Sequence, residues 1–316
     1  MLKIFNKTYP ECSKTYFNLN ISNYEIPCCV IAGKYNGKTI LITGQIHSGE
    51  YVGTPAIIRL CKMIDPVKVK GNLICFPCVN ISGFWQNYNA YVPEDHGNLN
   101  SNFPGDDHSI SGRIAQFFVR EIFPKVDFVF DLHCGGNNEI LTPCLFFATD
   151  ERVKSASIEI AKNLDIPYLL PSSSKKGLFS FAANVMHIPS LLLERGYASI
   201  LKKEWVEDYL NDILLALNAL GLIENMGVEN SISHMVFDEV IYQNSDEDAL
   251  WYPNVKVGSM VKKGGYLGRL EDFRGNVIKK YYALDDAVIL YYRVSLNASK
   301  DHNIVTYGLL RSCHQI

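Results

Sequence analysis

Residues 39–50 read Thr39-Ile40-Leu41-Ile42-Thr43-Gly44-Gln45-Ile46-His47-Ser48-Gly49-Glu50, and this stretch decides the fold of the chain. Its first five residues form a mainly apolar run that ends at Gly44, as a strand buried on both faces does. The segment 54–64 then carries apolar residues at helical spacing, with Pro55 near its start, where helices tolerate proline. A buried strand that leads into a helix predicts an α/β unit.

The same alternation continues over the first two thirds of the chain. Further apolar runs predict strands over residues 72–76, 126–130 and 190–193. Apolar residues at helical spacing predict helices over residues 111–123, 153–164 and 205–222. Strands that alternate with helices favour an α/β fold with a mostly parallel sheet flanked by helices. The segment 95–108 is rich in asparagine, glycine and aspartate, and we expect it to be a functional loop.

Three of the predicted strands lead directly into residues that can bind a metal or move a proton. The first leads into His47 and Glu50, the third into Asp131 and His133, and the fourth into Glu194. Because ligands bind outside the carboxyl ends of the strands in an open parallel sheet, we expect these side chains to face one crevice.

The residue types suit a catalytic zinc site. Two imidazoles and one carboxylate are a common ligand set that leaves a fourth position for water, and His47, Glu50 and His133 supply that set. Zinc lowers the pKa of bound water to about 7 and polarises a carbonyl oxygen. Hydrolysis also needs a group that takes a proton from water and returns it to the leaving amine. Glu194 is the candidate, since burial at the end of an apolar strand raises a carboxyl pKa.

Spacing alone leaves other interpretations open. A pair of the type H-x-x-E often occurs by chance, and a histidine after a strand is often structural. Asp131 either orients a ligand histidine or is a structural carboxylate.

The pattern changes after residue 225. Helical periodicity ends, and short alternating strands with glycine turns follow over residues 252–257, 260–261, 266–270, 279–283 and 287–294. We therefore predict two domains, a larger one over 1–225 and a small all-β one over 226–316.

Composition excludes several classes of protein. The chain has 316 residues, of which 47% are hydrophobic and 20% charged, so it can bury a sizeable core. A net charge of -3 and a pI of about 6.2 show no basic excess of the kind that nucleic-acid-binding proteins carry. No signal-like run follows Met1, and the apolar segment 210–223 is interrupted by polar residues. We expect a cytoplasmic protein with neither a nucleic-acid nor a membrane partner.

The nine cysteines also favour a reducing compartment. Several lie in apolar segments, as buried thiols do. Cys75 and Cys78 form a C-x-x-C pair, but they lie in and beside a predicted strand, whereas a redox pair is expected at the start of a helix.

Six motifs, taken in order, resemble the succinylglutamate desuccinylase/aspartoacylase family, a branch of the zinc carboxypeptidase superfamily. They are GQIHSGE (44–50), PCVNISGF (77–84), PED (93–95), NLNSNFPG (98–105), DLH (131–133) and LLLERG (191–196). The resemblance covers most of the chain and implies a zinc-carboxypeptidase-like fold, a homodimer and one zinc ion per chain on His47, Glu50 and His133. It also implies that Glu194 is the general base and acid and that Asn100 contacts substrate.

Two departures from the family bear on the substrate. Arginines that the family carries near the substrate are replaced here by Ala90 and Ser101. In the family they hold a substrate carboxylate and help to stabilise the oxyanion, and neither a methyl group nor a hydroxyl replaces a bidentate guanidinium. The departures argue against N-acyl-aspartate, succinylglutamate and ordinary carboxypeptidase substrates. Arg195 either supplies a substitute cation or points away from the site.

The segment 255–268 resembles the half-motif of biotinyl and lipoyl domains, which implies a barrel-sandwich-like C-terminal domain. A carrier role needs a modified lysine at a hairpin tip, and the expected tip, residues 283–287, has none. A structural role for this domain is therefore the better interpretation.

Together these features predict a zinc-dependent hydrolase that uses metal-activated water to cleave the amide bond of a small N-acyl amine or amino-acid derivative. A metallopeptidase and a non-catalytic, metal-containing binding protein are the alternatives. Turnover of N-acyl compounds separates the enzymes from the binding protein, and the preferred substrate separates a deacylase from a peptidase.

Overall fold

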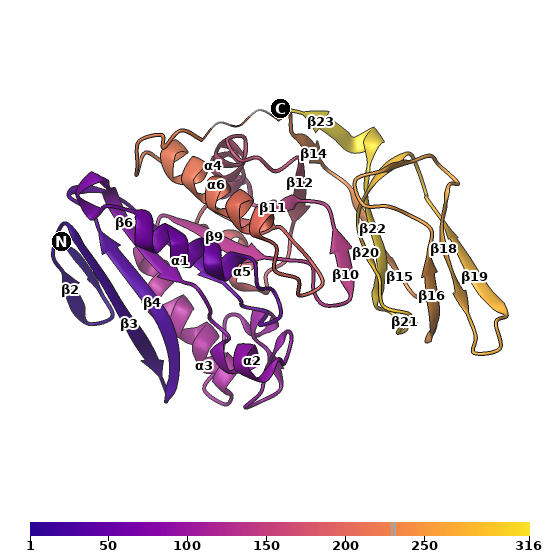
Figure 1. Ribbon diagram of the computed structural model, residues 1–316, viewed down its shortest axis with the longest axis horizontal. Helices are drawn as coiled ribbons and strands as arrows, with labels where there is room; N and C mark the ends of the chain where they lie inside the picture. The colour runs from indigo at the N-terminus through magenta and orange to yellow at the C-terminus, as the bar shows by residue number, and fades with distance from the viewer. Residues whose placement is uncertain (229, 231) are drawn as a thin grey trace.

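The computed structural model describes residues 1–228, 230 and 232–316. A large α/β part surrounds one ten-stranded sheet, and a smaller β-rich part, built mainly from C-terminal strands, lies beside it (Figure 1). This arrangement confirms the predicted α/β class and the predicted change from alternating strands and helices to short strands towards the C-terminus.

The ten-stranded sheet has the order β23-β14-β12-β11-β13-β9-β5-β6-β4-β3. Its strands, in chain order, are β3 (Ser13–Ile21), β4 (Tyr24–Ala32), β5 (Tyr35–Gly44), β6 (Lys70–Phe76), β9 (Phe128–His133), β11 (Cys144–Ala148), β12 (Tyr168–Ser172), β13 (Ser190–Glu194), β14 (Met235–Phe237) and β23 (Cys313–Gln315). The four strands predicted in this part are β5, β6, β9 and β13. They lie side by side in the sheet and pair in parallel.

Five of the nine strand pairs of this sheet are parallel, as predicted, and four are antiparallel. The pairs β11–β13, β4–β6, β3–β4 and β14–β23 are antiparallel. At the N-terminal edge the cause is local, because Ser22 and Asn23 both have positive φ (51° and 68°) and make a two-residue turn between β3 and β4. Such a turn joins neighbouring strands only as an antiparallel hairpin.

Helices cover both faces of the sheet. They are α1 (Gly53–Met63), α2 (Ile81–Gln86), α3 (Ile110–Phe117), α4 (Glu151–Ala161), α5 (Leu178–Asn184) and α6 (Lys203–Ala219). The predicted helices over 54–64, 153–164 and 205–222 are confirmed as α1, α4 and α6. The one predicted over 111–123 is α-helical only to Phe117; it continues as a π-turn (Phe118–Ile122) and a 3-10 turn (Phe123–Lys125) that contains Pro124.

The alternation of side chains along the central strands divides the core into two layers. In β5, Ile40 and Ile42 pack in the layer that contains α1 and α6, whereas Leu41 packs in the layer that contains α3 and α5. Figure 1 shows α1 and α6 together on the near face of the sheet. At Gly53, the first residue of α1, a Cβ would lie 2.9 Å from the Cβ of Leu132, so glycine allows the helix to approach β9 closely.

Two sheets make up the smaller part. One contains β10 (Glu139–Leu141), β15 (Val240–Asn244), β17 (Met260–Val261), β20 (Ala287–Arg293) and β22 (Asn303–Leu309), and the other contains β16 (Ala249–Pro253), β18 (Tyr266–Glu271), β19 (Val277–Tyr282) and β21 (Asn297–Ala298). They share a core centred on Trp251, Leu270, Ile289 and Tyr307.

Short elements complete the fold. They are the hairpins β1 (Leu2–Ile4) with β2 (Lys7–Tyr9) and β7 (Tyr91–Val92) with β8 (Gly97–Asn98), and 3-10 turns at Pro66–Lys68, Leu99–Asn102 and Leu310–Ser312. Among the described residues, no helix combines the length and the apolar character that crossing a bilayer requires.

The chain passes between the two parts more than once. Strands β14 and β23, which follow residue 225, belong to the large sheet, and β10, which precedes it, pairs with β20 in the smaller part. A shared apolar layer that includes Cys144, Leu170, Phe237, Val288 and Leu290 joins the two parts. The domain boundary at residues 225/226 stays a prediction.

A buried ion pair fixes the end of β13 against α6. The guanidinium of Arg195 contacts the carboxylate of Asp212, and Asp212 also accepts the backbone N–H of Asp165 at 3.1 Å. The two side chains are 6% and 0% exposed. Arg195 lies 3.6 Å from the carboxylate of Asp208 as well, but that side chain is 45% exposed.

We predict that Asp212→Ala lowers the free energy of unfolding by about 3–5 kcal/mol, because it leaves the buried guanidinium of Arg195 without its partner. Asp208→Ala is the matched control and should cost at most about 1 kcal/mol, because that pair is exposed to solvent. Urea denaturation followed by circular dichroism measures both, and equal losses would contradict this account of the ion pair.

Candidate metal centre and active site

The candidate ligands come from two segments that follow or end central strands. His47 and Glu50 lie in the loop between β5 and α1, and His133 is the last residue of β9. Since β5 and β9 are parallel neighbours, their carboxyl ends meet at one edge of the sheet. One nitrogen of each histidine and one oxygen of Glu50 all lie within 4.8 Å of one another.

Glu50 is the centre of this group. Its Oε1 lies 2.8 Å from His47 Nδ1 and its Oε2 lies 2.9 Å from His133 Nδ1. The backbone N–H of Cys134 donates to Oε2 at 3.1 Å. Burial alone would raise the pKa of Glu50, but the two imidazoles outweigh it and lower this pKa to about 2. Glu50 is therefore an anion at neutral pH.

A second carboxylate lies close to His133 on its other side. Asp131 Oδ2 lies 3.2 Å from His133 Nε2, and Thr43 donates its hydroxyl to Asp131 Oδ1 at 2.8 Å. Burial would lower the pKa of His133, but Asp131 and then Glu50 raise it well above its usual value. Of the two roles considered for Asp131, the geometry supports the orientation of His133.

Glu194 lies beside His133. The parallel register of β9 and β13 pairs the two residues directly. Burial, and then the negative charge of Glu50, raise the pKa of Glu194 well above its usual value. Its Oε2 is buried without a hydrogen-bond partner among the described residues, which leaves this oxygen for a group that enters from the site.

These residues fit a zinc ion. Ligand atoms that share one tetrahedral zinc at bonds of about 2.1 Å stand roughly 3.4 Å apart, and one ligand atom from each of the three residues lies within 4.8 Å of the others. The donor set of two imidazoles and a carboxylate is one that zinc prefers in catalytic sites. His47, Glu50 and His133 are therefore the residues that could hold the metal.

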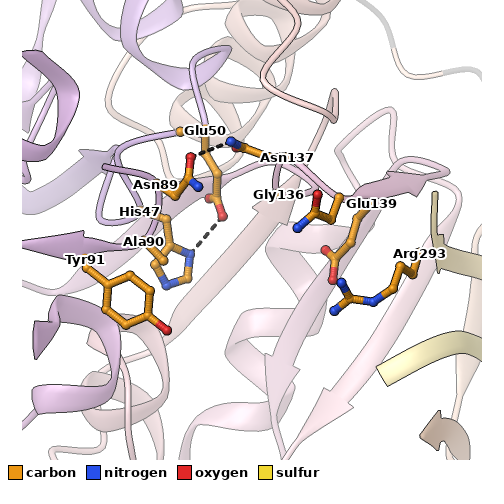
Figure 2. A pocket seen from close by; sticks show the side chains of 11 residues that line it. His47, Glu50, Asn89, Ala90, Tyr91, Gly136, Asn137, Glu139 and Arg293 are labelled. Atoms are coloured by element: carbon orange, nitrogen blue, oxygen red, sulfur yellow. Dashed lines mark hydrogen bonds and ion pairs between the residues drawn. The ribbon is translucent and has the colours of Figure 1, made fainter. Parts of the chain in front are cut away.

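Two of the candidate ligands, His47 and Glu50, line a pocket of about 330 Å³ (Figure 2), whereas His133 and Glu194 are not among the residues that line it. His47, which is 21% exposed, and Glu50 form one side of it. The loop residues Asn89, Ala90 and Tyr91 form a second side. The third side is formed by residues 136–139 and by Arg293, which comes from β20 of the smaller part.

Three other residues from the sequence analysis lie elsewhere. Asn100 is outside the lining of this pocket, and its Oδ1 accepts the backbone N–H of Leu178 at the start of α5 (2.9 Å). Ser101 donates its own backbone N–H to Asn98. Arg195 points into the core towards Asp212, so the structure excludes it as a substitute cation at the site.

Two important residues were missed at the sequence level. Tyr209 on α6 is buried, and its hydroxyl bonds the backbone carbonyls of His133 and Leu193 and accepts the N–H of Arg195 at 3.1 Å. A tyrosine on the buried face of a helix has the same pattern as any core residue, so the sequence contained no signal for this role. Arg293 was missed because it is the last residue of a mainly apolar strand, β20, in a part of the chain for which a structural role was predicted.

Comparison with known proteins agrees with this geometry. Residues 36–218 match the succinylglutamate desuccinylase/aspartoacylase catalytic domain. The chain belongs to this family. The predicted family is thereby confirmed, and with it the class of hydrolases that act on amide C–N bonds.

Relatives of this family member extend the match beyond the catalytic domain. It is 29% identical over 293 residues to N-alpha-acetyl-L-2,4-diaminobutyric acid deacetylase of Halomonas elongata, covering 87% of this chain and 84% of the relative. A succinylglutamate desuccinylase/aspartoacylase structure from Rhodobacter sphaeroides superimposes with a TM-score of 0.81 at 24% identity, over 94% of this chain and 95% of that one. The product-bound ectoine utilization protein EutE (DoeB) of Ruegeria pomeroyi gives 0.83 at 22% identity, over 96% and 98%. The two structures show that the fold is shared.

We predict that the purified protein holds about one zinc ion per chain and that His47→Ala and His133→Ala each lose it, because three protein ligands are the usual minimum of a catalytic site. Elemental analysis measures the metal content. His314→Ala, at a histidine that is 55% exposed, is the control and should keep the metal. Wild-type protein that takes up no zinc even after incubation with it would refute the site.

We also predict that Asp131→Asn weakens zinc binding by about 10–100-fold, because the amide no longer orients His133 through a charged contact. Competition with a chromophoric chelator measures the affinity. An unchanged affinity would show that Asp131 is only a structural carboxylate.

Proposed function

We propose that this protein is a zinc-dependent deacylase that hydrolyses the amide bond of a small N-acyl amino-acid derivative. One observation carries the proposal: the imidazoles of His47 and His133 and the carboxylate of Glu50 lie together. Glu194, whose carboxyl pKa is raised, is paired with His133 next to them. A ligand set and a proton-transfer group in one place are the two requirements of metal-assisted amide hydrolysis.

His47, Glu50 and His133 would hold the zinc. When bound there, zinc polarises the scissile carbonyl and makes water acidic enough to attack at neutral pH. Asp131 and Thr43 keep the His133 ring in the orientation that metal binding needs. Tyr209 fixes the backbone of His133 and Leu193, the residues at the ends of two neighbouring strands.

Glu194 would transfer the proton. A carboxyl group whose pKa lies well above its usual value can accept a proton from the attacking water and still release it to the leaving amine. The free Oε2 of Glu194 is the atom available for both transfers. Its position beside His133 would place it near a carbonyl group that the zinc polarises.

The size of the pocket supports a small substrate over a peptide. A volume of about 330 Å³ is at the lower end of the range of small-molecule sites. The sequence relative from Halomonas elongata is named for the deacetylation of an N-acetylated diamino acid, which is a molecule of this size. We extend that chemistry, removal of an acyl group from an amino-acid nitrogen, to this chain.

The smaller part would form one wall of the active site. We propose that it has the barrel-sandwich architecture, which its two sheets around one core support.

Asn100 would contact substrate through Nδ2, because its Oδ1 accepts the backbone N–H of Leu178. We also propose a cytoplasmic location, which the nine free thiols support.

We predict that Glu194→Gln lowers kcat by about 10²–10⁴-fold while the zinc content and the urea denaturation midpoint stay unchanged, because the amide cannot transfer the proton. Release of free amine from a panel of N-acyl amino acids measures the activity. Glu224→Gln, at an exposed position, is the control and should have full activity. Equal activity of the Glu194 variant and the wild type would refute the assigned role.

A further inference from the structure

Two residues of opposite charge face each other in the wall of the active-site pocket. Glu139 on β10 and Arg293 on β20 are direct partners in the antiparallel pairing of these strands. Both line the pocket that also contains His47 and Glu50. Figure 2 shows the carboxylate of Glu139 and the guanidinium of Arg293 turned towards each other on the side of the pocket opposite His47.

The guanidinium of Arg293 is held by neutral groups. Its Nε donates to the backbone carbonyl of Asn303 and its Nη1 donates to the hydroxyl of Ser295, both at 3.2 Å. These two bonds fix the direction of the side chain and use two of its five N–H donors. The remaining donors include those of Nη2, and paired donors of this kind match the two oxygens of a carboxylate.

Glu139 is suited to a cation. Its strand, β10, begins at the pocket with Glu139 itself. Burial, followed by the charge of Glu50, raises the pKa of Glu139, and Arg293 lowers it to a smaller extent. An ammonium group placed beside this carboxylate would therefore stabilise its ionised form. The pocket thus offers one anion and one cation within a pair of neighbouring strands.

We propose that Glu139 and Arg293 form the specificity site of the enzyme and select a zwitterionic N-acyl amino acid. Arg293 binds the carboxylate of the substrate, and Glu139 binds an ammonium group on its side chain. This inference rests on the proposed deacylase function, because it names the substrate class that the same pocket accepts.

The charges of the pocket also determine which substrates are rejected. An N-acyl derivative of a dicarboxylic amino acid brings two carboxylates, and Arg293 is the cation among the residues that line the pocket. Its second carboxylate would lie near Glu139 and Glu50 and be repelled. Ala90, which lines the same pocket, supplies no charge to offset that repulsion.

Three acetylated probes separate the two contacts. N-α-acetyl-2,4-diaminobutyrate carries both charged groups, N-acetyl-2-aminobutyrate lacks only the ammonium group, and N-α-acetyl-2,4-diaminobutyramide lacks only the carboxylate. We expect kcat/KM of the zinc-loaded wild type to be about tenfold to a hundredfold higher for the first probe than for either of the others, as hydrogen bonds to charged groups predict.

Glu139→Gln should abolish the preference for the ammonium group and leave the preference for the carboxylate. Arg293→Met should abolish the preference for the carboxylate, and Arg269→Met, which removes a cation on β18 of the same part, is its control and should keep both preferences. Circular dichroism identifies a variant that fails to fold, and Glu139→Gln, which is nearly isosteric, tests the site independently. A Glu139 variant with the wild-type preference, or N-acetyl-aspartate as the best wild-type substrate, would overturn the specificity site.

Binding separates a failure of this site from a failure of the proposed function. Isothermal titration of 2,4-diaminobutyrate into the zinc-loaded wild type and into Glu139→Gln should show binding that the variant weakens by about tenfold or more. A wild type that cleaves none of the acetyl compounds but shows this difference would refute the deacylase and retain the site. A wild type that cleaves the acetyl compounds but binds 2,4-diaminobutyrate no better than Glu139→Gln does would refute the specificity site and retain the deacylase.

Discussion

The parallel register of β9 and β13 is the constraint on which the candidate active site depends. It pairs Glu194 with His133, so a proton-transfer group and a metal ligand more than sixty positions apart in the chain become neighbours. Tyr209 on α6 stabilises this register because its hydroxyl bonds backbone carbonyls of both strands. The buried pair of Arg195 and Asp212 anchors the chain immediately after β13 to the same helix. A shift of one residue would turn Glu194 to the other face of the sheet.

Electrostatics explains why this edge of the sheet is suited to a cation. Glu50, Asp131 and Glu194 bring three carboxyl groups to two imidazoles in a region that is largely buried. Unpaired buried carboxylates are costly, and burial followed by the charge of Glu50 raises the pKa of Glu194. A divalent cation at the imidazoles would balance this charge, since bound metal ions are often the largest local charges in such sites. Burial, and then the charge of Glu50, raise the pKa of Glu194, as a proton-transfer group requires.

The smaller part contributes to the chemistry of the pocket as well as to its shape. The pairing of β10 with β20 places Glu139 opposite Arg293, so the two charges come from segments that are far apart in the sequence. Asparagine side chains around the metal ligands, with Asn137 bonded to Asn89 and to Ser199, order the neighbouring wall. A family fold can in this way keep its reaction while the residues that contact the substrate change.

Much of the structure could be predicted from local patterns. The apolar runs of β5, β6, β9 and β13 and the periodicity of α1, α4 and α6 identified the α/β core, because burial on both faces requires continuous apolar strands. The motifs around His47, Glu50, His133 and Glu194 indicated the candidate site because metal ligands at strand ends leave a short, dense signature. The antiparallel pairs of the sheet were not predicted, since strand direction depends on turns and on long-range pairing. Only the tertiary structure showed that Arg195 turns into the core while Arg293 turns into the pocket. The direction in which a charged side chain points is set by partners distant in sequence, and no local pattern records them.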